Sequence, residues 1–373
     1  VAGYSSANKL NQKMQGGRDM RRILGRLWKV TGMVVLIAGM AMSFSGCIDT
    51  GDKAEGKNPI KIGVAIYRGD DTFISSVSSY LTSGGKALET KLGRKVIINI
   101  ADAKNNQGSQ NDQVDNFISR GYDIICVNMV DRTAAAVIAD KAKEANIPII
   151  FFNREPVEED MQIWDKEYYV GTDAREAGIL QGELLISEYG RNPENMDKNG
   201  DGKLQYVMLE GEQVHQDALI RTEYSVKTVL QAGIEMDKLG NETCNWMRSL
   251  SYEAMLKWLE KYGSAIEVVM ANNDEMALGA VQALREKNML ENGPVIVGID
   301  GIKECLESIS KGDIYGTVKN DAKKQAEVIL TIGGACAEGK DPKNLVPELD
   351  GHYVRVPHYK VTKVNAEVLL KEE

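Results

Sequence analysis

The stretch IKIGVAI at residues 60–66, followed by the polar turn YRGDD at residues 67–71, decides the fold. The first segment is short, apolar and rich in β-branched residues, which favours a strand that is covered on both faces. Apolar residues then recur every three to four positions from Phe73 to Leu88, which predicts an amphipathic helix. This order of strand, turn and helix is the building unit of a parallel α/β sheet.

The same alternation continues along the chain. Further strands are predicted at residues 96–100, 124–128, 147–152, 204–209, 266–271 and 295–299, and about one helix separates each from the next. A length of 373 residues suits about two domains. The sequence therefore predicts an α/β protein of two Rossmann-like lobes with parallel-rich sheets, in which ligands bind beyond the carboxyl ends of the strands.

The composition is that of an ordinary globular protein, with 43% hydrophobic and 27% charged residues. These values exclude a disordered chain, a collagen and a protein with many membrane spans. Most of the chain is acidic, because the net charge is −9 although residues 1–46 carry seven basic residues and one acidic residue. An acidic body repels phosphate backbones, so we expect no nucleic-acid partner.

The N-terminal segment has the pattern of an export signal. Seven basic residues precede the apolar stretch 33–44, and the small residues Ser45 and Gly46 stand directly before Cys47. This order predicts a lipoprotein signal over residues 1–46 with lipidation at Cys47, followed by a flexible tether at residues 47–58. The alternative is a retained membrane anchor, because residues 30–48 carry no charge and approach the roughly 20 residues that span a bilayer.

The four other cysteines are scattered through apolar segments at Cys126, Cys244, Cys305 and Cys336. Wide spacing in apolar surroundings favours buried free thiols over a disulfide framework. The sequence contains no CxxC motif, so neither a zinc site nor redox chemistry is indicated.

Polar side chains gather after the predicted strands. They are Asp70, Asp71, Asn128, Asp131, Asn153, His215, Asp217, Arg221, Asn272, Asn273, Asp274, Asp300, Asn320 and Asp321. A pyranose is bound by planar amides, carboxylates and guanidinium groups at its rim and by aromatic rings on its faces, for which Phe73 and Trp246 are candidates. Each Asp or Asn alone is more simply explained as a helix N-cap, but caps do not account for Arg221 or Trp246.

Seven motifs between residues 60 and 364 resemble one family. They are YRGDDTF at 67–73, QNDQ at 110–113, FFNREP at 151–156, YYVGTD at 168–173, ANND at 271–274, GTVKNDA at 316–322 and VRVP at 354–357. These segments resemble the periplasmic galactose/glucose-binding proteins, the sugar-binding components of ABC transporters. The resemblance implies the type I periplasmic binding protein fold, with three hinge crossings between lobes that we expect at residues 59–147 plus 320–354 and 148–319 plus 355–373.

The resemblance also implies a function without catalysis. The expected protein is lipid-anchored at the outer face of the cell membrane or in the periplasm, is a monomer, captures D-glucose or D-galactose, and delivers it to a membrane permease. A chemoreceptor or sensor kinase is a further expected partner, and a secreted carbohydrate-active enzyme using Asp217 and Asp300 is the alternative. The implied sugar contacts are Asp71, Phe73, Asn128, His215, Asp217, Arg221, Trp246, Asn273, Asp300 and Asn320.

The segment DKNGDGKLQ at residues 197–205 has the spacing of an EF-hand loop. Oxygen donors stand at positions 1, 3, 5, 7 and 9, and Gly202 occupies the tight turn at position 6. Position 12 is Met208 instead of a bidentate Glu, and the resemblance implies that Glu267 replaces it. A structural Ca²⁺ is therefore expected, and an acidic surface turn is the alternative; the expected ligands are Asp197, Asn199, Asp201, Lys203, Gln205 and Glu267.

Overall fold

The computed structural model describes residues 58–372. The predicted signal at residues 1–46, the lipidation site Cys47 and all but the last residue of the predicted tether lie outside the described residues. Among residues 58–372, none of the helices combines the length and apolar character needed to cross a membrane.

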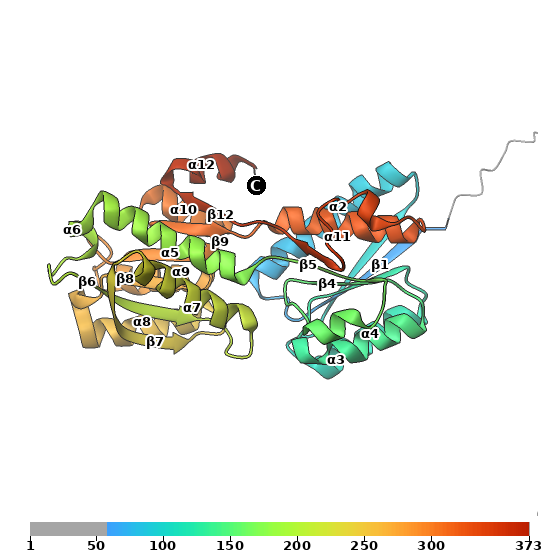
Figure 1. Cartoon of the computed structure of the whole chain (residues 1–373), viewed down its shortest axis with the longest axis horizontal. Coiled ribbons are helices and arrows are strands. Elements are labelled where there is room, and N and C mark those ends of the chain that lie inside the picture. The colour runs from blue at the N-terminus through green and yellow to red at the C-terminus, as the bar shows by residue number, and fades with distance from the viewer. Residues whose placement is uncertain (1–57, 373) are drawn as a thin grey trace, which may run out of the picture. The chain divides into compact units, whose positions relative to one another are not determined.

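The N-terminal lobe is built on a sheet of six parallel strands in the order β11-β5-β4-β3-β1-β2 (Figure 1). Its strands are β1 (Ile60–Ile66), β2 (Val96–Asp102), β3 (Ile124–Val127), β4 (Ile149–Phe152), β5 (Glu167–Gly171) and β11 (Tyr353–Arg355). Its helices are α2 (Thr72–Leu92), α3 (Gln107–Ser119), α4 (Ala135–Glu144) and α11 (Ala322–Ala337), with 3₁₀ turns at Arg132–Ala134, Glu158–Gln162 and Pro342–Asn344.

The C-terminal lobe repeats this plan in the order β12-β10-β9-β8-β6-β7, with only the β10–β12 pair antiparallel among the described strand pairs. Its strands are β6 (Lys203–Glu210), β7 (Glu235–Thr243), β8 (Val268–Ala271), β9 (Val295–Asp300), β10 (Gly316–Lys319) and β12 (Tyr359–Thr362). Its helices are α5 (Ala174–Arg191), α6 (Pro193–Met196), α7 (Gln216–Gln231), α8 (Arg248–Tyr262), α9 (Asp274–Glu286), α10 (Lys303–Lys311) and α12 (Lys363–Glu372), with a 3₁₀ turn at Gly263–Ala265.

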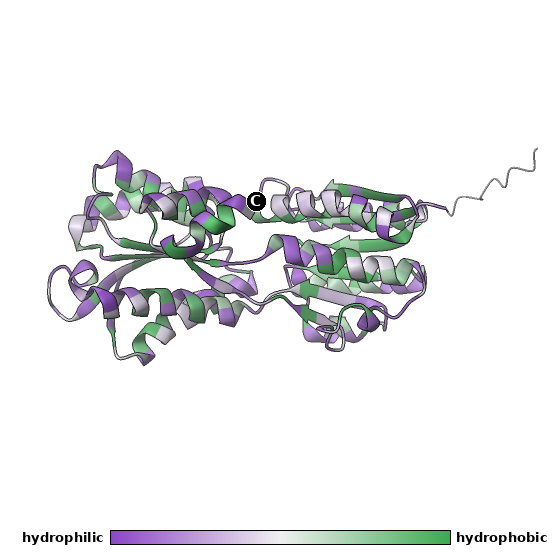
Figure 2. Cartoon of the chain, turned by 90° about the horizontal axis from the view of Figure 1, so that it is seen from above, coloured by the Kyte–Doolittle hydropathy of each residue, from purple (hydrophilic) through white to green (hydrophobic). Residues whose placement is uncertain are grey.

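Each sheet has a hydrophobic core on both of its faces. Along β1, Ile62 and Val64 pack with residues of α2 and α11, whereas Ala65 belongs to the opposite core with residues of α3 and α4. Gly63 leaves room for the ring of Phe117, because a Cβ atom at Gly63 would lie 2.5 Å from that ring. Figure 2 shows the apolar strands enclosed between helices whose outer faces are hydrophilic. The prediction of doubly covered, parallel-rich sheets is confirmed.

The chain crosses between the lobes three times within the described residues, after β5, after β10 and after β11. The three predicted hinge crossings are therefore present, but the predicted first boundary at residues 147 and 148 is wrong. Ile149 of β4 pairs with Ile125 of β3, and Glu167 of β5 pairs with Ile149, so both strands extend the N-terminal sheet. The short helix α4 makes a local crossover that returns β4 beside β3, and the first crossing follows Gly171.

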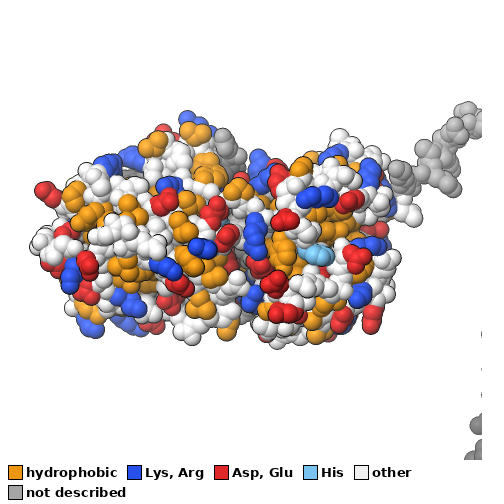
Figure 3. Space-filling model, viewed as in Figure 1, with side chains coloured by type: hydrophobic (Ala, Val, Ile, Leu, Met, Phe, Trp, Pro, Cys, Tyr) orange, Lys and Arg blue, Asp and Glu red, His pale blue; other side chains and the backbone are white. Residues whose placement is uncertain are grey.

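The structure also shows the state of the cysteines and the distribution of surface charge. Cys126, Cys244 and Cys305 are buried and Cys336 is partly buried, and all four are free thiols within the described part of the chain, as expected. On the face shown in Figure 3, basic and acidic side chains are interspersed, with no large basic patch on that face.

Candidate functional site

Side chains from both lobes surround one small cavity of about 30 Å³. The side chains close the cavity to little more than the space of one water molecule in this arrangement, so a ring could enter only after the walls move apart. Eight of the ten predicted contacts line it, together with Tyr67, Ile74, Asn153 and Arg154. The eight are Asp71, Phe73, His215, Asp217, Arg221, Trp246, Asn273 and Asp300.

Two aromatic rings come to this cavity from opposite lobes. Phe73 lies in the first turn of α2 and is 7% exposed, and Trp246 follows β7 and is 8% exposed. The Trp246 ring lies against Gly211, where a Cβ atom would approach the ring to 2.1 Å. The structure therefore places both predicted aromatic plates in the wall of one cavity.

Asp71 and Asn273 are helix caps as well as cavity residues. One carboxylate oxygen of Asp71 accepts a hydrogen bond from the Ile74 amide at 2.9 Å, and the other accepts one from the Tyr67 hydroxyl at 2.6 Å. The side-chain oxygen of Asn273 accepts a hydrogen bond from the Met276 amide at 3.0 Å. Asp71 and Asn273 can therefore serve both as helix caps and as cavity residues, because each capping hydrogen bond also fixes the orientation of a polar group at the cavity.

His215, Asp217 and Arg221 form one group at the start of α7. The Nδ1 atom of His215 accepts a hydrogen bond from the Asp217 amide at 3.1 Å, so a neutral imidazole carries its proton on Nε2. Arg221 donates through Nη2 to the Asp217 carboxylate at 3.3 Å and through Nη1 to the Asn272 carbonyl at 3.0 Å. The buried Nε of Arg221 has no hydrogen-bond partner among residues 58–372, so this N–H group is available to donate a hydrogen bond to a ligand oxygen.

Burial shifts the ionisation of these groups. It lowers the pKa of His215 well below its usual value, and nearby Arg154 and Arg221 add to this, so the imidazole is neutral near pH 7. Burial also raises the pKa of Asp217, against the opposing effect of Arg221. Burial raises the pKa of Asp300 well above its usual value, with Arg221 opposing the rise and Asp274 adding to it. Burial is the largest cause of all three shifts, so these side chains are shielded from water.

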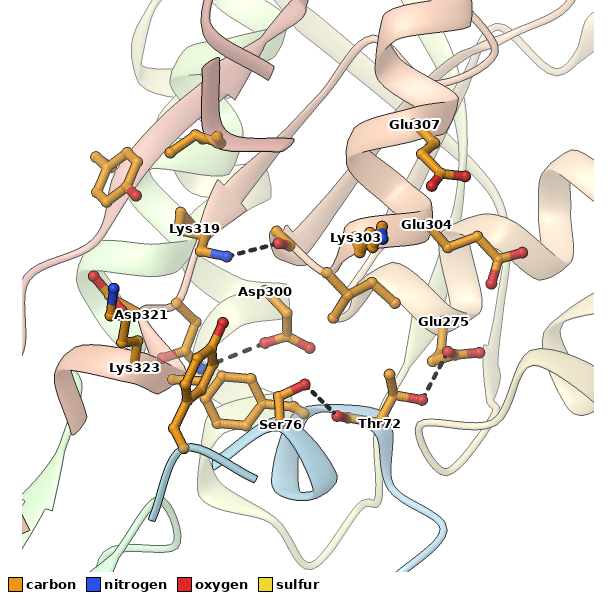
Figure 4. Close-up of a pocket in the computed structure, with 18 residues that line it drawn as sticks. Thr72, Ser76, Glu275, Asp300, Lys303, Glu304, Glu307, Lys319, Asp321 and Lys323 are labelled. Atoms are coloured by element: carbon orange, nitrogen blue, oxygen red, sulfur yellow. Dashed lines mark hydrogen bonds between the residues drawn. The ribbon is translucent and has the colours of Figure 1, made fainter. Parts of the chain in front are cut away.

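Asp300 ends β9 with φ at 125°, a conformation that non-glycine residues rarely adopt. Asn320 donates a hydrogen bond to its carboxylate at 3.4 Å (Figure 4). The turn that follows is held by Asp274, which accepts hydrogen bonds from the Ile302 amide at 2.9 Å and the Thr317 hydroxyl at 2.6 Å. A strained residue so firmly supported is typical of a functional site, where the backbone presents one side chain in a fixed direction.

The other two predicted contacts do not line this cavity: Asn128 lies behind its wall, and Asn320 lines an adjoining cavity that shares Phe73 and Asp300 with it. Asn128 is fully buried and donates to the side-chain oxygen of Asn153 at 3.1 Å. Asn320 is 2% exposed and accepts a hydrogen bond from the Gln325 amide at 2.6 Å while it donates to Asp300. In this arrangement the two amides orient cavity residues and do not themselves line the cavity.

The family described as "Periplasmic binding protein domain" matches residues 62–341. The chain belongs to the periplasmic binding proteins. It is similar to the D-galactose/methyl-galactoside binding periplasmic protein MglB of Haemophilus influenzae, with 37% identity over 313 residues that cover 83% of this chain and 92% of that relative. It is also similar to a putative rhizopine-binding protein of Rhizobium meliloti, with 31% identity and coverage of 82% and 90%.

Solved structures give the same result for the fold. An ABC transporter solute binding protein from Bacillus halodurans with bound myo-inositol has 28% identity and a TM-score of 0.70, with coverage of 86% of this chain and 100% of that one. A galactofuranose binding protein has the same TM-score at 20% identity and shows the fold alone. The family resemblance and the two-lobed fold predicted from the sequence are therefore confirmed. Members of this family are periplasmic, which implies a location outside the cytoplasm.

Three residues that line the cavity of this periplasmic binding protein were not predicted from the sequence: Tyr67, Ile74 and Arg154. Tyr67 directly follows β1, and the Arg154 guanidinium carbon lies 3.7 Å from the centre of its ring. Asn153 was noted as a strand-end residue but was not selected, although its φ of 61° and its place after β4 mark it as special. The signal for Tyr67 and Asn153 was their position immediately after a strand, which is the type of position from which other contacts were selected.

The loop at residues 197–205 folds around Glu267, which is 1% exposed. The Glu267 carboxylate accepts hydrogen bonds from the amides of Lys198 at 2.6 Å and Gln205 at 3.0 Å. The Asp201 carboxylate accepts from the side-chain amides of Gln205 at 2.9 Å and Asn199 at 3.3 Å. Glu267, the distant carboxylate that the resemblance implies, therefore lies at this loop.

This loop is compatible with a hard cation of the size of Ca²⁺. Its donors are carboxylate, amide and carbonyl oxygens, which is the chemistry that Ca²⁺ selects. No group of three or more His, Cys, Asp or Glu side chains in the described part of the chain is clustered as a metal site. A cation here would thus depend also on the oxygens of Asn199 and Gln205, whose amides would have to turn their oxygens inward in place of the NH₂ groups that now face Asp201.

Proposed function

We propose that this periplasmic binding protein captures D-galactose or D-glucose in the cavity between its lobes and delivers it to the membrane permease of an ABC transporter. The observation that carries the proposal is the pairing of Phe73 and Trp246, from opposite lobes, around a belt of polar side chains. A pyranose has two weakly apolar faces and a rim of hydroxyl groups, so its surface matches this arrangement.

The polar belt can satisfy hydroxyl groups in both of their roles. Asp71 and Asp217 offer acceptor oxygens, whereas Arg221, His215 and Asn273 offer N–H donors. A relative at 37% identity is named for D-galactose and methyl-galactoside, and a structural relative contains myo-inositol. All three ligands are small rings that carry several hydroxyl groups, which supports a polyhydroxylated ring as the ligand class.

Sugar capture in such a cavity couples binding to lobe closure. A hexose that contacts Asp71 on one lobe and Arg221 on the other interacts fully only when the lobes are closed, so it shifts the population toward the closed form. The permease can then distinguish loaded from empty protein by shape. A chemoreceptor or sensor kinase could respond to the same change.

A binding screen by titration calorimetry tests this proposal. We expect D-galactose, D-glucose or both to bind one site, and to bind more tightly than ribose, xylose, arabinose and myo-inositol. Preference for a pentose or for myo-inositol would overturn the hexose assignment, and binding of none of these rings by folded protein would overturn the function. Recovery of chemically altered sugar after long incubation would instead support the enzyme alternative.

Two predictions from the sequence complete the proposal. A structural Ca²⁺ in the 197–205 loop would link α6 to β6 and would keep the buried Glu267 charge compensated. Lipidation at Cys47 would tether the protein to the outer face of the membrane near its permease. Mass spectrometry of the N-terminal peptide tests the lipidation, since the acylated cysteine carries a defined added mass.

A further inference from the structure

A carboxylate of the C-terminal lobe is inserted between two arginines of the N-terminal lobe. Glu212 follows β6, and its Oε2 atom lies 2.9 Å from Nη2 of Arg154, which follows β4. Its Oε1 atom lies 4.0 Å from Nη1 of Arg68, which follows β1. The contact joins the two lobes directly beside the cavity that we assign to the sugar.

We propose that Glu212 is a positioning residue that couples lobe closure to sugar binding without touching the sugar. The inference rests on the proposed function, because it assigns a closing contact to that same site. Glu212 is absent from the described residues that line the sugar cavity and lines instead a larger adjoining cavity of about 880 Å³, whereas its partner Arg154 lines both. Glu212 thus influences the ligand through the arrangement of the lobes.

The N-terminal half of this contact is continuous with the cavity wall. The Arg154 guanidinium stacks on the Tyr67 ring at 3.7 Å, and the Tyr67 hydroxyl donates to Asp71 at 2.6 Å. Arg154 also donates through Nη1 to the Val130 carbonyl at 3.0 Å, so its position is fixed from the N-terminal lobe. A closing contact with Arg154 therefore acts on groups that are already oriented toward the sugar.

The C-terminal half is equally close to the site. Glu212 directly follows Gly211, against which the Trp246 ring lies. Movement of the Glu212 backbone therefore also moves the support of Trp246. The contact connects the N-terminal wall at Tyr67 with the C-terminal wall at Trp246, one on each lobe.

Burial makes this contact sensitive to the distance between the lobes. Arg154 is 5% exposed and Glu212 is 9% exposed, so little water reaches the pair. When the lobes separate, each charge is solvated again and the pair is lost. Removal of the Glu212 charge therefore leaves Arg154 buried without its partner in the closed form only. Arg154 retains an orphaned buried Nε among the described residues, which a ligand oxygen in the cavity would satisfy at closure.

A second contact between the lobes lies at another opening of the cleft. The Thr72 hydroxyl of α2 donates to Glu275 of α9 at 2.8 Å (Figure 4). Glu275 is held within its own lobe by Arg248 at 2.8 Å. A hydroxyl donor forms a weaker hydrogen bond to a carboxylate than a guanidinium does, so we expect Glu212 to contribute more to closure.

The test is Glu212→Gln in the otherwise unchanged protein. The fraction of molecules that can close sets the apparent affinity, so we expect hexose binding about tenfold weaker by calorimetry, with the same order of preference among hexoses. The closed fraction at subsaturating sugar, measured by energy transfer between labels on the two lobes, should fall in parallel. Glu212→Asp, which keeps the charge, should lose less affinity.

Glu183→Gln is the matched control. It removes the same charge from an ion pair within the C-terminal lobe, where Glu183 lies 2.6 Å from Lys360. We expect its affinity to stay within about twofold of the wild type, because a half-exposed pair inside one lobe does not report on closure.

Several results separate this proposal from others. Unchanged affinity and closure in Glu212→Gln would overturn the positioning role while leaving the hexose function intact. A changed preference among hexoses would also overturn it, because that result requires direct contact with the sugar. Additive losses of Glu212→Gln and Arg154→Met in a double-mutant cycle would show that the two side chains are not coupled. Failure of the wild-type protein to bind any hexose would overturn the proposed function itself.

Discussion

Three residues of the cavity adopt backbone conformations that are uncommon for residues with a side chain. Asn153, Trp246 and Asp300 have φ values of 61°, 65° and 125°. Such conformations cost about 1–3 kcal/mol each and persist where the surrounding structure holds them. Their concentration in one cavity indicates that the direction of these side chains matters more than local stability.

The first prediction concerns Trp246→Ala. A buried aromatic anchor at a binding site contributes about 2 kcal/mol or more, so hexose affinity should fall roughly 30-fold or more. The melting temperature should also fall, because Trp246 belongs to the hydrophobic core of the C-terminal lobe and its truncation leaves a cavity. Calorimetry and a thermal melt measure the two effects, and wild-type affinity in the variant would show that the ring does not contact the ligand.

The second prediction concerns Gly211→Ala. The added methyl group would lie 2.1 Å from the Trp246 ring, so the ring must move from its place in the cavity wall. Overpacking of this kind costs about 1–3 kcal/mol, and we expect the loss mainly in hexose affinity. Gly190→Ala on α5 is the control, since a methyl group there meets nothing within 4 Å. Equal affinities of the two variants would contradict the placement of Trp246.

The sequence predicts residues of this site well where a polar side chain follows an evident strand. Asp71 and Asp300 were found in this way, and the structure places both at the cavity. Arg154 was missed because its role depends on stacking against Tyr67 and on an acidic residue of the other lobe. Contacts across such a distance in the sequence leave no local pattern.

At the scale of elements, the predicted strands correspond to β1, β2, β3, β4, β6, β8 and β9, whereas β5, β7, β10, β11 and β12 were not predicted. β7 reads EMDKLGNET and is largely exposed, so the apolar run that marks a buried strand is missing. β12 is a short strand of partly exposed residues that pairs antiparallel with β10. Such strands form because a neighbouring strand offers hydrogen-bond partners, and this tertiary effect is invisible in local composition.

The third prediction concerns the turn after β9, which Asp274 holds. Burial raises the pKa of Asp274 to about 6, against the opposing hydrogen bond from Thr317. Because the folded protein binds this proton more tightly than the unfolded chain does, the contribution is fully present at low pH and is lost as pH rises from about 4 to about 6. Urea unfolding from pH 4 to 7 should therefore show a smaller decline in Asp274→Asn than in the wild type. Parallel pH profiles would contradict this.

The fourth prediction concerns the 197–205 loop. If Ca²⁺ binds only the folded loop, a free Ca²⁺ concentration about 100 times the dissociation constant raises the free energy of unfolding by roughly 2.7 kcal/mol. Chelation should then lower the melting temperature by roughly 5 °C and leave hexose affinity unchanged. Glu267→Gln should be less stable than the wild type in calcium and should not respond to chelator. If the chelator leaves the melting temperature of the wild type unchanged, the loop is an acidic turn that binds no metal.

At the scale of the whole molecule, the two-lobed plan follows from the alternation of apolar strands and amphipathic helices. The lobe boundary does not, because β4 and β5 have the same composition whichever sheet they join. Only the pairing of β4 with β3 assigns them to the N-terminal lobe. The order of strands, and hence the position of the hinge, is therefore a property of the packed sheet.

The three crossings explain how the site can open and close. They follow Gly171, Lys319 and Arg355, so the lobes are joined by short segments while each sheet keeps its own two cores. Hinge motion of this kind changes few contacts within a lobe. Opening therefore breaks mainly the contacts between the lobes. Among the ion pairs that join the lobes in the described part of the chain, the Glu212–Arg154 pair is the most buried.

The central claim is that a hexose is held between the two aromatic rings and is enclosed by both lobes. A crystal structure of the protein grown with D-galactose or D-glucose tests it most directly. We expect the sugar ring between Phe73 and Trp246, with its hydroxyl groups hydrogen-bonded to Asp71, Arg221 and Asp300. A hexose bound elsewhere, or in this cavity without contact to either ring, would contradict the account.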